Sequence, residues 1–254
     1  MNKRGKNKYF SHYNFFPKNR RGSHVEVIIS FIIFVTFIFF IFLIIEPSVN
    51  TQKEKEGVLN NIEFEIMDRI SSDMTIITVK VTSSTSQNCI ELDEEITNLG
   101  IDSRIVSKGS SEQPLNCYIS SADSDDLRIE RTSTSDNFLK IYSSDAFAQA
   151  ESSSSSCQNL QRGTNYELGL TKTDKYIFET KILDLINEDY ETLKSSLKIP
   201  KGVEFGYGIK LSNGTTFETE GKELSTNIYV KETPIKYVDS KGNILIGFLK
   251  TKVW

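Results

Sequence analysis

Histidine is almost absent from this chain: only two of its 254 residues are histidines. Both of them, His12 and His24, precede the long apolar run that begins at Val27. A Ser–His–Asp or Cys–His catalytic arrangement needs an imidazole, and so does a histidine metal site. The part of the chain after the apolar run cannot form any of these sites. We therefore expect no metal, no cofactor and no enzymatic activity.

Acidic residues are absent from residues 1–25, which carry seven basic residues. Basic residues beside a spanning helix remain on the cytoplasmic side of the membrane. We therefore expect residues 1–22 to be a basic cytoplasmic segment. Nucleic-acid binding is the other use of such a tail, but the adjacent apolar run favours a topology signal. The basic residues are Lys3, Arg4, Lys6, Lys8, Lys18, Arg20 and Arg21.

Charged residues are also absent from Val27–Ile45, a run of 19 residues in which only Ser30 and Thr36 are polar. A helix of this length, at about 1.5 Å per residue, roughly spans the ~30 Å hydrocarbon core of a bilayer. The run does not end in small residues of the A-x-A type, as a cleaved secretory peptide does. We therefore predict a retained transmembrane helix over residues 23–46 and an extracytoplasmic location for the residues after it.

The part of the chain after Glu46 has an excess of acid. Of the 30 basic and 34 acidic residues, seven and two lie at or before Glu46, so the remainder has a net charge of −9. Such a surface argues against binding to anionic lipid or to nucleic acid. The partners that we expect are the lipid bilayer around the span, and like subunits or other surface proteins around the rest.

Cysteine is scarce, and all three cysteines lie on the predicted outer side: Cys89, Cys117 and Cys157. In an oxidising compartment two of them could pair. We favour a disulfide between Cys89 and Cys117, because Cys157 follows a run of serines that predicts a flexible loop. Three free or buried thiols are an equal alternative, since the spacing alone does not determine a pairing.

The stretch after the span supports two secondary structures. Ile62, Phe64 and Ile66 alternate as in a strand, whereas Leu59, Ile62, Ile66 and Ile70 recur at three- and four-residue steps as on one helical face. The helical pattern covers more residues, and the Glu/Lys-rich stretch before it favours helix. We therefore predict a membrane-proximal amphipathic helix over residues 47–71.

Residues 72–254 predict a β-rich outer domain. The segment Met74–Val81 is typical of a strand, and short strands are expected within 116–120, 126–130 and 137–143. Two strands are expected around a turn at Thr171–Asp174. Apolar residues from Ile182 to Leu197 predict one amphipathic helix that ends before Pro200. The fold class is α+β and mainly antiparallel. The outer domain is either one domain or two, with the boundary between the two near 170–175.

A hairpin is predicted where a strictly alternating segment, Val203–Leu211, is followed by Asn213-Gly214. A second hairpin is predicted from Asn227 to the C-terminus. Asn213 also begins a glycosylation sequon with Thr215, on the side of the membrane where glycans are added. Turn and glycan are compatible, because hairpin tips are exposed.

Two other motifs do not support a site. Asp123, Asp125 and Asp126 lack the glycine and the closing glutamate of an EF-hand loop, so we predict a solvated acidic loop. Gly206 and Gly208 lack the third glycine of a dinucleotide fingerprint. They indicate instead a strand that another backbone approaches closely.

A basic leader, an apolar span, an amphipathic continuation and a sheet follow one another along the chain. This order resembles type IV pilin-like proteins, archaeal ones included. In that family a membrane peptidase cuts after a glycine that follows basic residues. The resemblance implies a cut after Gly22, a new N-terminus at Ser23 and a role for Glu26 in pairing with a neighbouring subunit. Glu26 would be the fourth residue after the cut, whereas the family pattern has a glutamate at the fifth.

Three functions are compatible with this organisation. The first is a single-pass surface protein with a pilin-like stalk, a β-rich head and a structural or assembly role. The second is a plain membrane-anchored binding or receptor module without processing or assembly. The third is a membrane-tethered enzyme, which the shortage of histidine disfavours.

Overall fold

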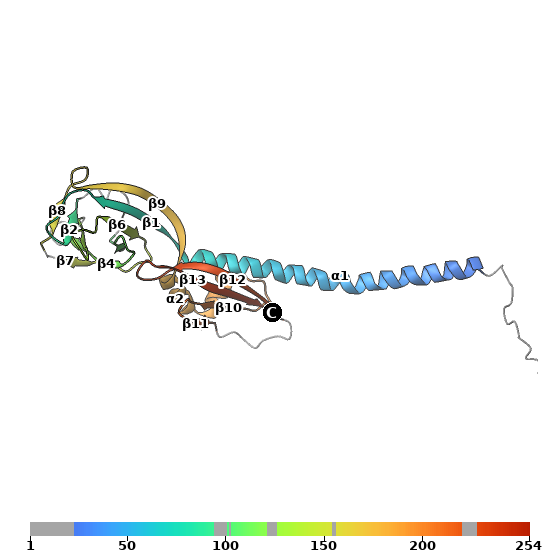
Figure 1. The fold of residues 1–254 in the computed structure, drawn as a ribbon. Helices are drawn as coiled ribbons and strands as arrows, with labels where there is room; N and C mark the ends of the chain where they lie inside the picture. Colours follow the sequence, from blue (N-terminus) through green and yellow to red (C-terminus); the bar gives the residue numbers. More distant parts are fainter. Residues whose placement is uncertain (1–22, 94–100, 102, 121–125, 154–155, 220–227) are drawn as a thin grey trace, which may run out of the picture. The chain divides into compact units, whose positions relative to one another are not determined.

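The computed structural model describes residues 23–93, 101, 103–120, 126–153, 156–219 and 228–254. The chain divides into two compact units, residues 1–53 and residues 54–254. One helix, α1 (Ser23–Arg69), contributes residues to both units (Figure 1). The predicted span and the predicted amphipathic segment are thus parts of a single helix, which ends close to the expected residue 71.

The second unit is an α+β structure whose strands are mostly antiparallel, as the sequence predicts. Only three strand pairs are parallel in the described part of this unit: β9 with β12, β2 with β8, and β4 with β7. The order of the strands in the sheet is β11-β10-β13-β12-β9-β1-β6-β3-β4-β5-β2-β8, with β7 attached to β4. The strands are β1 (Ser71–Val81), β2 (Cys89–Leu92), β3 (Ile105–Lys108), β4 (Pro114–Ser120), β5 (Leu127–Glu130), β6 (Phe138–Ser143), β7 (Glu151–Ser153), β8 (Gln158–Leu160), β9 (Tyr166–Phe178), β10 (Phe205–Lys210), β11 (Thr216–Glu218), β12 (Tyr229–Val238) and β13 (Ile244–Val253).

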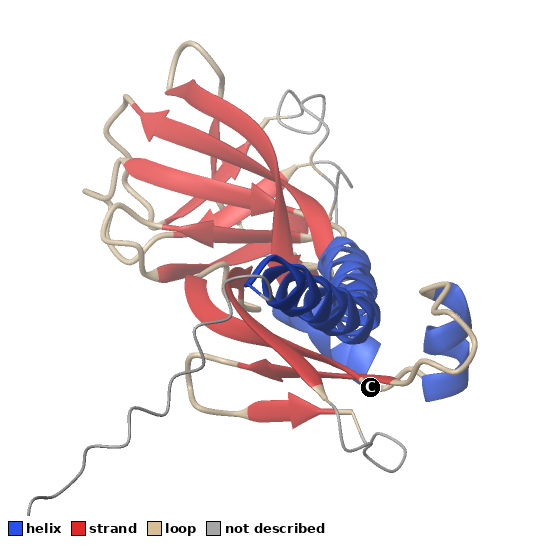
Figure 2. Cartoon of the chain, turned by 90° about the vertical axis from the view of Figure 1, so that its right-hand side faces the viewer, coloured by secondary structure: helices blue, strands red, loops and turns tan. Residues whose placement is uncertain are grey.

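The last part of α1 packs on the sheet through the predicted helical face. Leu59, Ile62, Ile66 and Ile70 are all buried, whereas Phe64 on the other side is 67% exposed. This pattern decides between helix and strand, because a strand would place Phe64 on the same face as Ile62 and Ile66 and would bury all three together. The four residues share a core with the inner side of β10, β12 and β13, and Figure 2 shows the helices lying against these strands.

The predicted turn at Thr171–Asp174 is wrong, because β9 runs without interruption from Tyr166 to Phe178. It pairs with β1 along almost its whole length, from Ser71 opposite Ile177 to Val81 opposite Tyr166. Strand β1 provides hydrogen-bond partners for the backbone of the polar residues in the middle of β9, which these residues would lack in a local turn. The boundary expected near 170–175 falls inside β9 and stays a prediction.

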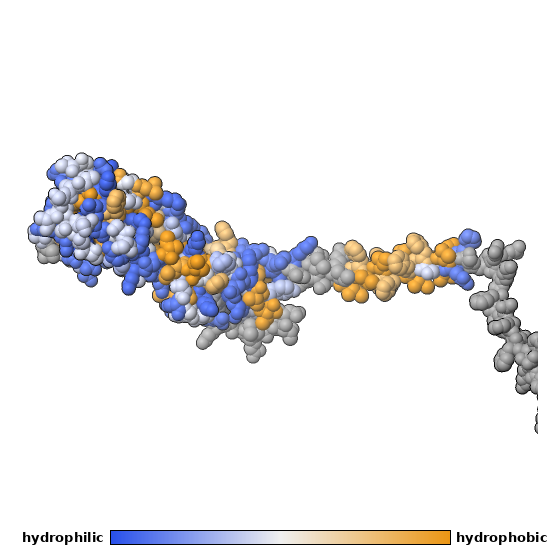
Figure 3. Space-filling model, in the orientation of Figure 1, coloured by the Kyte–Doolittle hydropathy of each residue, from blue (hydrophilic) through white to orange (hydrophobic). Residues whose placement is uncertain are grey.

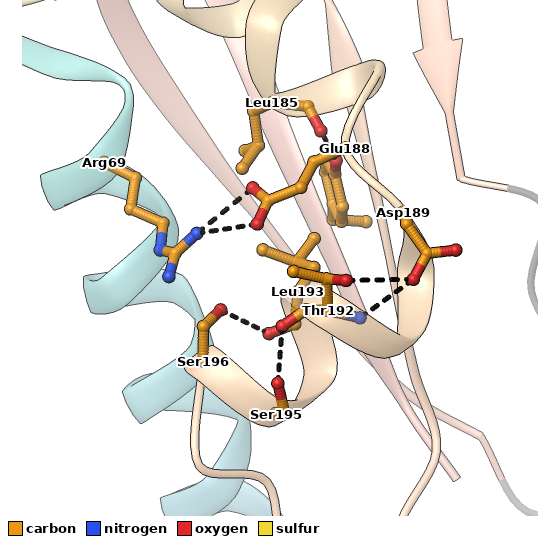
Figure 4. Close-up of polar contacts among 9 residues, drawn as sticks. Arg69, Leu185, Glu188, Asp189, Thr192, Leu193, Ser195 and Ser196 are labelled. Atoms are coloured by element: carbon orange, nitrogen blue, oxygen red, sulfur yellow. Dashed lines mark hydrogen bonds and ion pairs between the residues drawn. The ribbon is translucent and has the colours of Figure 1, made fainter.

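The predicted single helix from Ile182 to Leu197 is also wrong: two helices replace it, α2 (Glu179–Ile186) and α3 (Tyr190–Ser196). The break occurs because Asp189 acts as a new N-cap, in extended conformation. Its Oδ2 accepts a hydrogen bond of 3.0 Å from the backbone N–H of Thr192 (Figure 4). This bond satisfies one of the amide groups that a helix N-terminus leaves open, and it lowers the pKa of Asp189.

Both predicted hairpins are confirmed. Strands β10 and β11 pair antiparallel on either side of Asn213-Gly214, and β12 and β13 pair over ten residues, from Tyr229 opposite Val253 to Val238 opposite Ile244. Gly214 has a φ of 86°, which favours glycine at this turn. The strands predicted at Met74–Val81 and within 116–120, 126–130 and 137–143 are also present, as parts of β1, β4, β5 and β6.

Three clusters of buried side chains fill the second unit. The C-terminal core lies between the helices and β10, β12 and β13. The N-terminal core lies among β1–β6, β8 and the first part of β9. A small third cluster joins them, and its buried members are Met74, Tyr142, Ala146, Phe147, Phe178 and Val238.

Candidate functional site

The first part of α1 has the composition of a membrane anchor. Within the described residues, His24–Ile44 is the one helical stretch that is long and apolar enough to cross a membrane, with a mean hydropathy of 3.3. Every side chain in this stretch is exposed, and Figure 3 shows the resulting apolar surface. The hydroxyl of Thr36 donates to the carbonyl oxygens of Ile32 and Ile33, at 2.9 Å each. These bonds let a polar side chain remain in an apolar environment.

The residues of the predicted processing site lie at the start of this helix. Ser23 is the first residue of α1, and Glu26 lies in its first turn with its side chain exposed. A carboxylate in the first turn of a helix is favourable because the helix dipole is positive there. Gly22 lies outside the described residues, so cleavage after it stays a prediction.

Within the second unit, a polar cluster connects α1 to β12. Glu63 is 7% exposed, and its Oε1 accepts a hydrogen bond of 2.6 Å from Thr233 Oγ1. Its Oε2 lies 2.5 Å from Lys231 Nζ, which also donates to Asn60 Oδ1 at 2.9 Å. The buried carboxylate is therefore satisfied on both oxygens, and it aligns the helix with one particular register of β12.

A second connection lies at the end of α1. Arg69 Nη1 is 3.1 Å and 3.4 Å from the two carboxylate oxygens of Glu188, between α2 and α3 (Figure 4). On the neighbouring position, Asp68 accepts a hydrogen bond from Lys175 of β9. These ion pairs are about half exposed or less, so each adds little stability by itself. Together they hold the end of the helix to both the sheet and the short helices.

A buried lysine joins the N-terminal strands to the last hairpin. Lys108 of β3 is 3% exposed, and its Nζ donates to Gly242 O and Asn243 Oδ1, at 2.8 Å each. It also lies 5.5 Å from the centre of the Tyr142 ring. Burial lowers the pKa of Lys108, although the nearby Glu112 and Asp239 act in the opposite direction. The contacts of the Lys108 amine are structural, because they connect β3 to the loop between β12 and β13.

The disulfide in the structure is Cys89–Cys157, not the favoured Cys89–Cys117. Cys89 precedes Ile90, which is opposite Gln158 in the parallel pair β2/β8, and this places Cys157 beside it. Cys117 is opposite Ile129 in β5, whereas Cys89 is opposite Glu130. The two cysteines thus lie on opposite faces of the sheet with β5 between them, too far apart to bond.

Cys117 remains a free thiol at a partly buried position beside the N-terminal core. Burial raises its pKa to about 11, so it stays protonated at neutral pH. Its Sγ lies 2.7 Å from Ser107 Oγ. Cys117 packs against the N-terminal core from a partly buried position, and there it acts as a small apolar residue.

Asn213 lies at the exposed tip of the β10–β11 hairpin, where its Oδ1 accepts a hydrogen bond of 2.9 Å from Thr215 N. This local bond is typical of a turn asparagine. The position leaves the amide nitrogen accessible from solvent. Glycosylation of Asn213 stays a prediction.

In the part of the chain that the structure describes, no three or more His, Cys, Asp or Glu residues form a cluster that could bind a metal ion. Asp123 and Asp125 lie outside the described residues, and Asp126 is buried. Gly206 and Gly208 are approached mainly by side chains: a Cβ on Gly206 would lie 3.4 Å from the Trp254 ring, and one on Gly208 3.0 Å from Glu218. The backbone approach predicted for these glycines is present only at Gly208, where the Phe217 oxygen lies 3.2 Å from that position.

Sequence reasoning missed an exposed apolar surface on β13. Ile244, Ile246 and Phe248 alternate along the strand and are 49%, 60% and 40% exposed, while the residues between them face the C-terminal core. We call this surface, centred on Ile244, Ile246 and Phe248, the outer sheet face. A shallow hollow of about 200 Å³ beside Phe248 also contacts Lys210, Glu232 and Lys250. The signal in the sequence was a strand that is apolar on both faces.

Comparisons with known protein families, with curated proteins and with solved structures found no match to this chain.

Proposed function

We propose that this chain is a single-pass membrane-anchored surface protein with a structural or assembly role, built from a pilin-like stalk helix and a β-rich head. The observation that carries the proposal is the continuity of α1. Its first part, His24–Ile44, is apolar and exposed, and its last part provides Leu59, Ile62, Ile66 and Ile70 to the core of the second unit. One element thus serves as anchor and as core, which a cleaved signal peptide would not do.

The orientation that we propose follows from the basic residues before the span, which place the N-terminus in the cytoplasm and the head outside. The Cys89–Cys157 disulfide supports this orientation, because disulfides persist in oxidising compartments. The exposed sequon at Asn213 is compatible with it as well.

Protease treatment of intact cells tests the orientation. We expect the head to be degraded from outside, and a tag at residue 1 to be protected until the cells are permeabilised. A head that is protected in intact cells and degraded after permeabilisation would contradict the proposal.

Mass spectrometry of the N-terminus of the membrane-extracted protein tests the pilin-like part. We expect a chain that begins at Ser23, and we expect Gly22→Leu to abolish that terminus because a bulky residue would obstruct the peptidase. Gly5→Leu, in the same basic segment, is the matched control and should leave the terminus unchanged. An intact residue 1–22 segment in the wild-type protein would favour the plain anchored module instead.

A further inference from the structure

The C-terminal part of the second unit has two unequal sides. The side that carries Leu249 and Ile235 is covered by α1, α2 and α3, whereas the outer sheet face is not covered by a helix of the described chain (Figure 2). Apolar residues that alternate along one face of a strand are typical of a sheet that is covered on that side as well. The three exposed side chains of β13 are therefore suited to a contact with another molecule.

The outer sheet face is bordered by positive charge. Lys210 of β10 is opposite Phe248, and Lys236 of β12 is opposite Ile246. Lys250 is next on the same side of β13, opposite Glu232. Glu218 also lines the hollow beside Phe248, and it forms an ion pair with Lys252. Four lysines and two glutamates thus surround the apolar centre, and their net positive charge favours a partner surface that is apolar in the middle and acidic around it.

The chain carries such a surface on α1. Gly57, Asn61, Phe64 and Asp68 follow one another at steps of four, three and four residues, on the side of the helix opposite the buried face. We call these four residues the helix stripe. Phe64 is its apolar centre, and the acidic residues Glu54, Glu65 and Asp68 lie along it, of which Asp68 also forms an ion pair with Lys175 of its own chain.

Gly57 in the helix stripe has no explanation within its own chain. Glycine inside a helix costs about 1 kcal/mol relative to alanine. A Cβ at Gly57 would meet nothing within 4 Å, so the packing of the described chain does not require its absence. A glycine does allow another backbone or side chain to approach the helix closely, which a second molecule on this stripe would use.

We propose that the helix stripe of one copy docks on the outer sheet face of a second copy, with Phe64 against Ile246 and Phe248. This inference rests on the proposed assembly function and identifies the contact that would produce it. The two surfaces differ, and each copy has both, so the contact is head-to-tail. Contacts of this kind continue from copy to copy, as a filament or a closed ring.

Disulfide trapping between full-length chains tests the contact. Two differently tagged variants, Phe64→Cys and Phe248→Cys, are placed together in phospholipid vesicles, in a Cys117→Ser background, and are mildly oxidised. We expect a dimer that contains both tags when the two variants are mixed. Neither variant alone should give a dimer, because each would then need its own surface as partner.

Two further variants test whether the bond depends on the position of the cysteine and on the charge of the surface. Phe138→Cys is the matched control, because Phe138 is 51% exposed but lies on β6, away from both surfaces. It should not bond with Phe64→Cys. Reversing the charge of Lys210 and Lys250 to Glu in the Phe248→Cys chain should lower the yield of the mixed dimer about tenfold, for a loss of about 1.4 kcal/mol.

The outcomes that overturn the proposal are distinct from failure of the proposed function. Dimers of Phe64→Cys alone or Phe248→Cys alone would show a symmetric contact and contradict the head-to-tail arrangement. If no mixed dimer forms, amine cross-linking of the wild-type chain shows whether the chain assembles at all. A ladder of oligomers without the mixed dimer would refute this contact but keep an assembly role. If neither the ladder nor the mixed dimer forms, both the contact and the proposed assembly role are refuted.

Discussion

Glu63 of α1 accepts a hydrogen bond of 2.6 Å from Thr233 of β12, across 170 residues of sequence. The carboxylate is 7% exposed and also contacts Lys231. A charge in this position is tolerated because both of its oxygens have donors. The same helix that carries the apolar anchor is in this way fixed to the last hairpin of the chain.

Replacing Glu63 should therefore weaken the head. We expect Glu63→Ala to lower the free energy of unfolding by about 2 kcal/mol, because Thr233 and Lys231 lose a partner at a largely buried position. Glu63→Gln should cost less, since the amide oxygen can still accept from Thr233. Denaturant unfolding in detergent, followed by the fluorescence of Trp254, measures both. Glu56→Ala, at an exposed position of the same helix, is the control, and an equal loss there would contradict the argument.

The disulfide gives a second prediction. Cys157→Ser should lower the free energy of unfolding by about 2–4 kcal/mol, because the bond restricts the unfolded chain between positions 68 residues apart. Cys117→Ser, which removes only a partly buried free thiol, should cost much less. Peptide mapping without reduction should find Cys89 linked to Cys157 and Cys117 as a free thiol. A Cys89–Cys117 peptide would contradict the structure.

The head should lose stability at high pH. Burial raises the pKa of Tyr190 and of Tyr207 to about 12, whereas a tyrosine in the unfolded chain ionises near pH 10. Since the folded state holds these protons longer, the stabilisation is complete below pH 10 and is lost as the pH rises toward 12. Denaturant unfolding across this interval, with phenolate absorbance as a second signal, measures the loss.

Tyr207→Phe isolates one of the two groups. Its hydroxyl donates to Leu185 O at 2.9 Å, so the variant should lose about 1 kcal/mol at neutral pH. It should also lose less stability than the wild type between pH 10 and 12, because one titrating group is gone. Tyr229→Phe, at a half-buried position, is the control. An unchanged alkaline slope in Tyr207→Phe would contradict the assignment.

The exposed turn at Asn213 gives a test in a glycosylating host. If the head is exported there, we expect a glycan on Asn213, visible as a mass increase that enzymatic deglycosylation removes. Asn213→Gln and Thr215→Ala should each abolish it, while Thr216→Ala, one residue beyond the sequon, should not. An unmodified chain with a protease-accessible head would show that the sequon is unused.

Local patterns in the sequence determined several elements. The apolar run from Val27 to Ile45, the helical face from Leu59 to Ile70 and the Asn213-Gly214 turn each depend on residues close in sequence. The predicted span, the buried helical face and both hairpins could therefore be derived from periodicity and turn chemistry alone.

The tertiary structure decided what depends on distant partners. Strand β9 passes through polar residues because β1 pairs with it, and Cys157 bonds to Cys89 because β8 lies beside β2. The helix breaks at Asp189 because a capping bond outweighs a continuous apolar pattern. The outer sheet face became visible only when the helices proved to cover one side of β13, since sequence periodicity does not tell which of two apolar faces is buried.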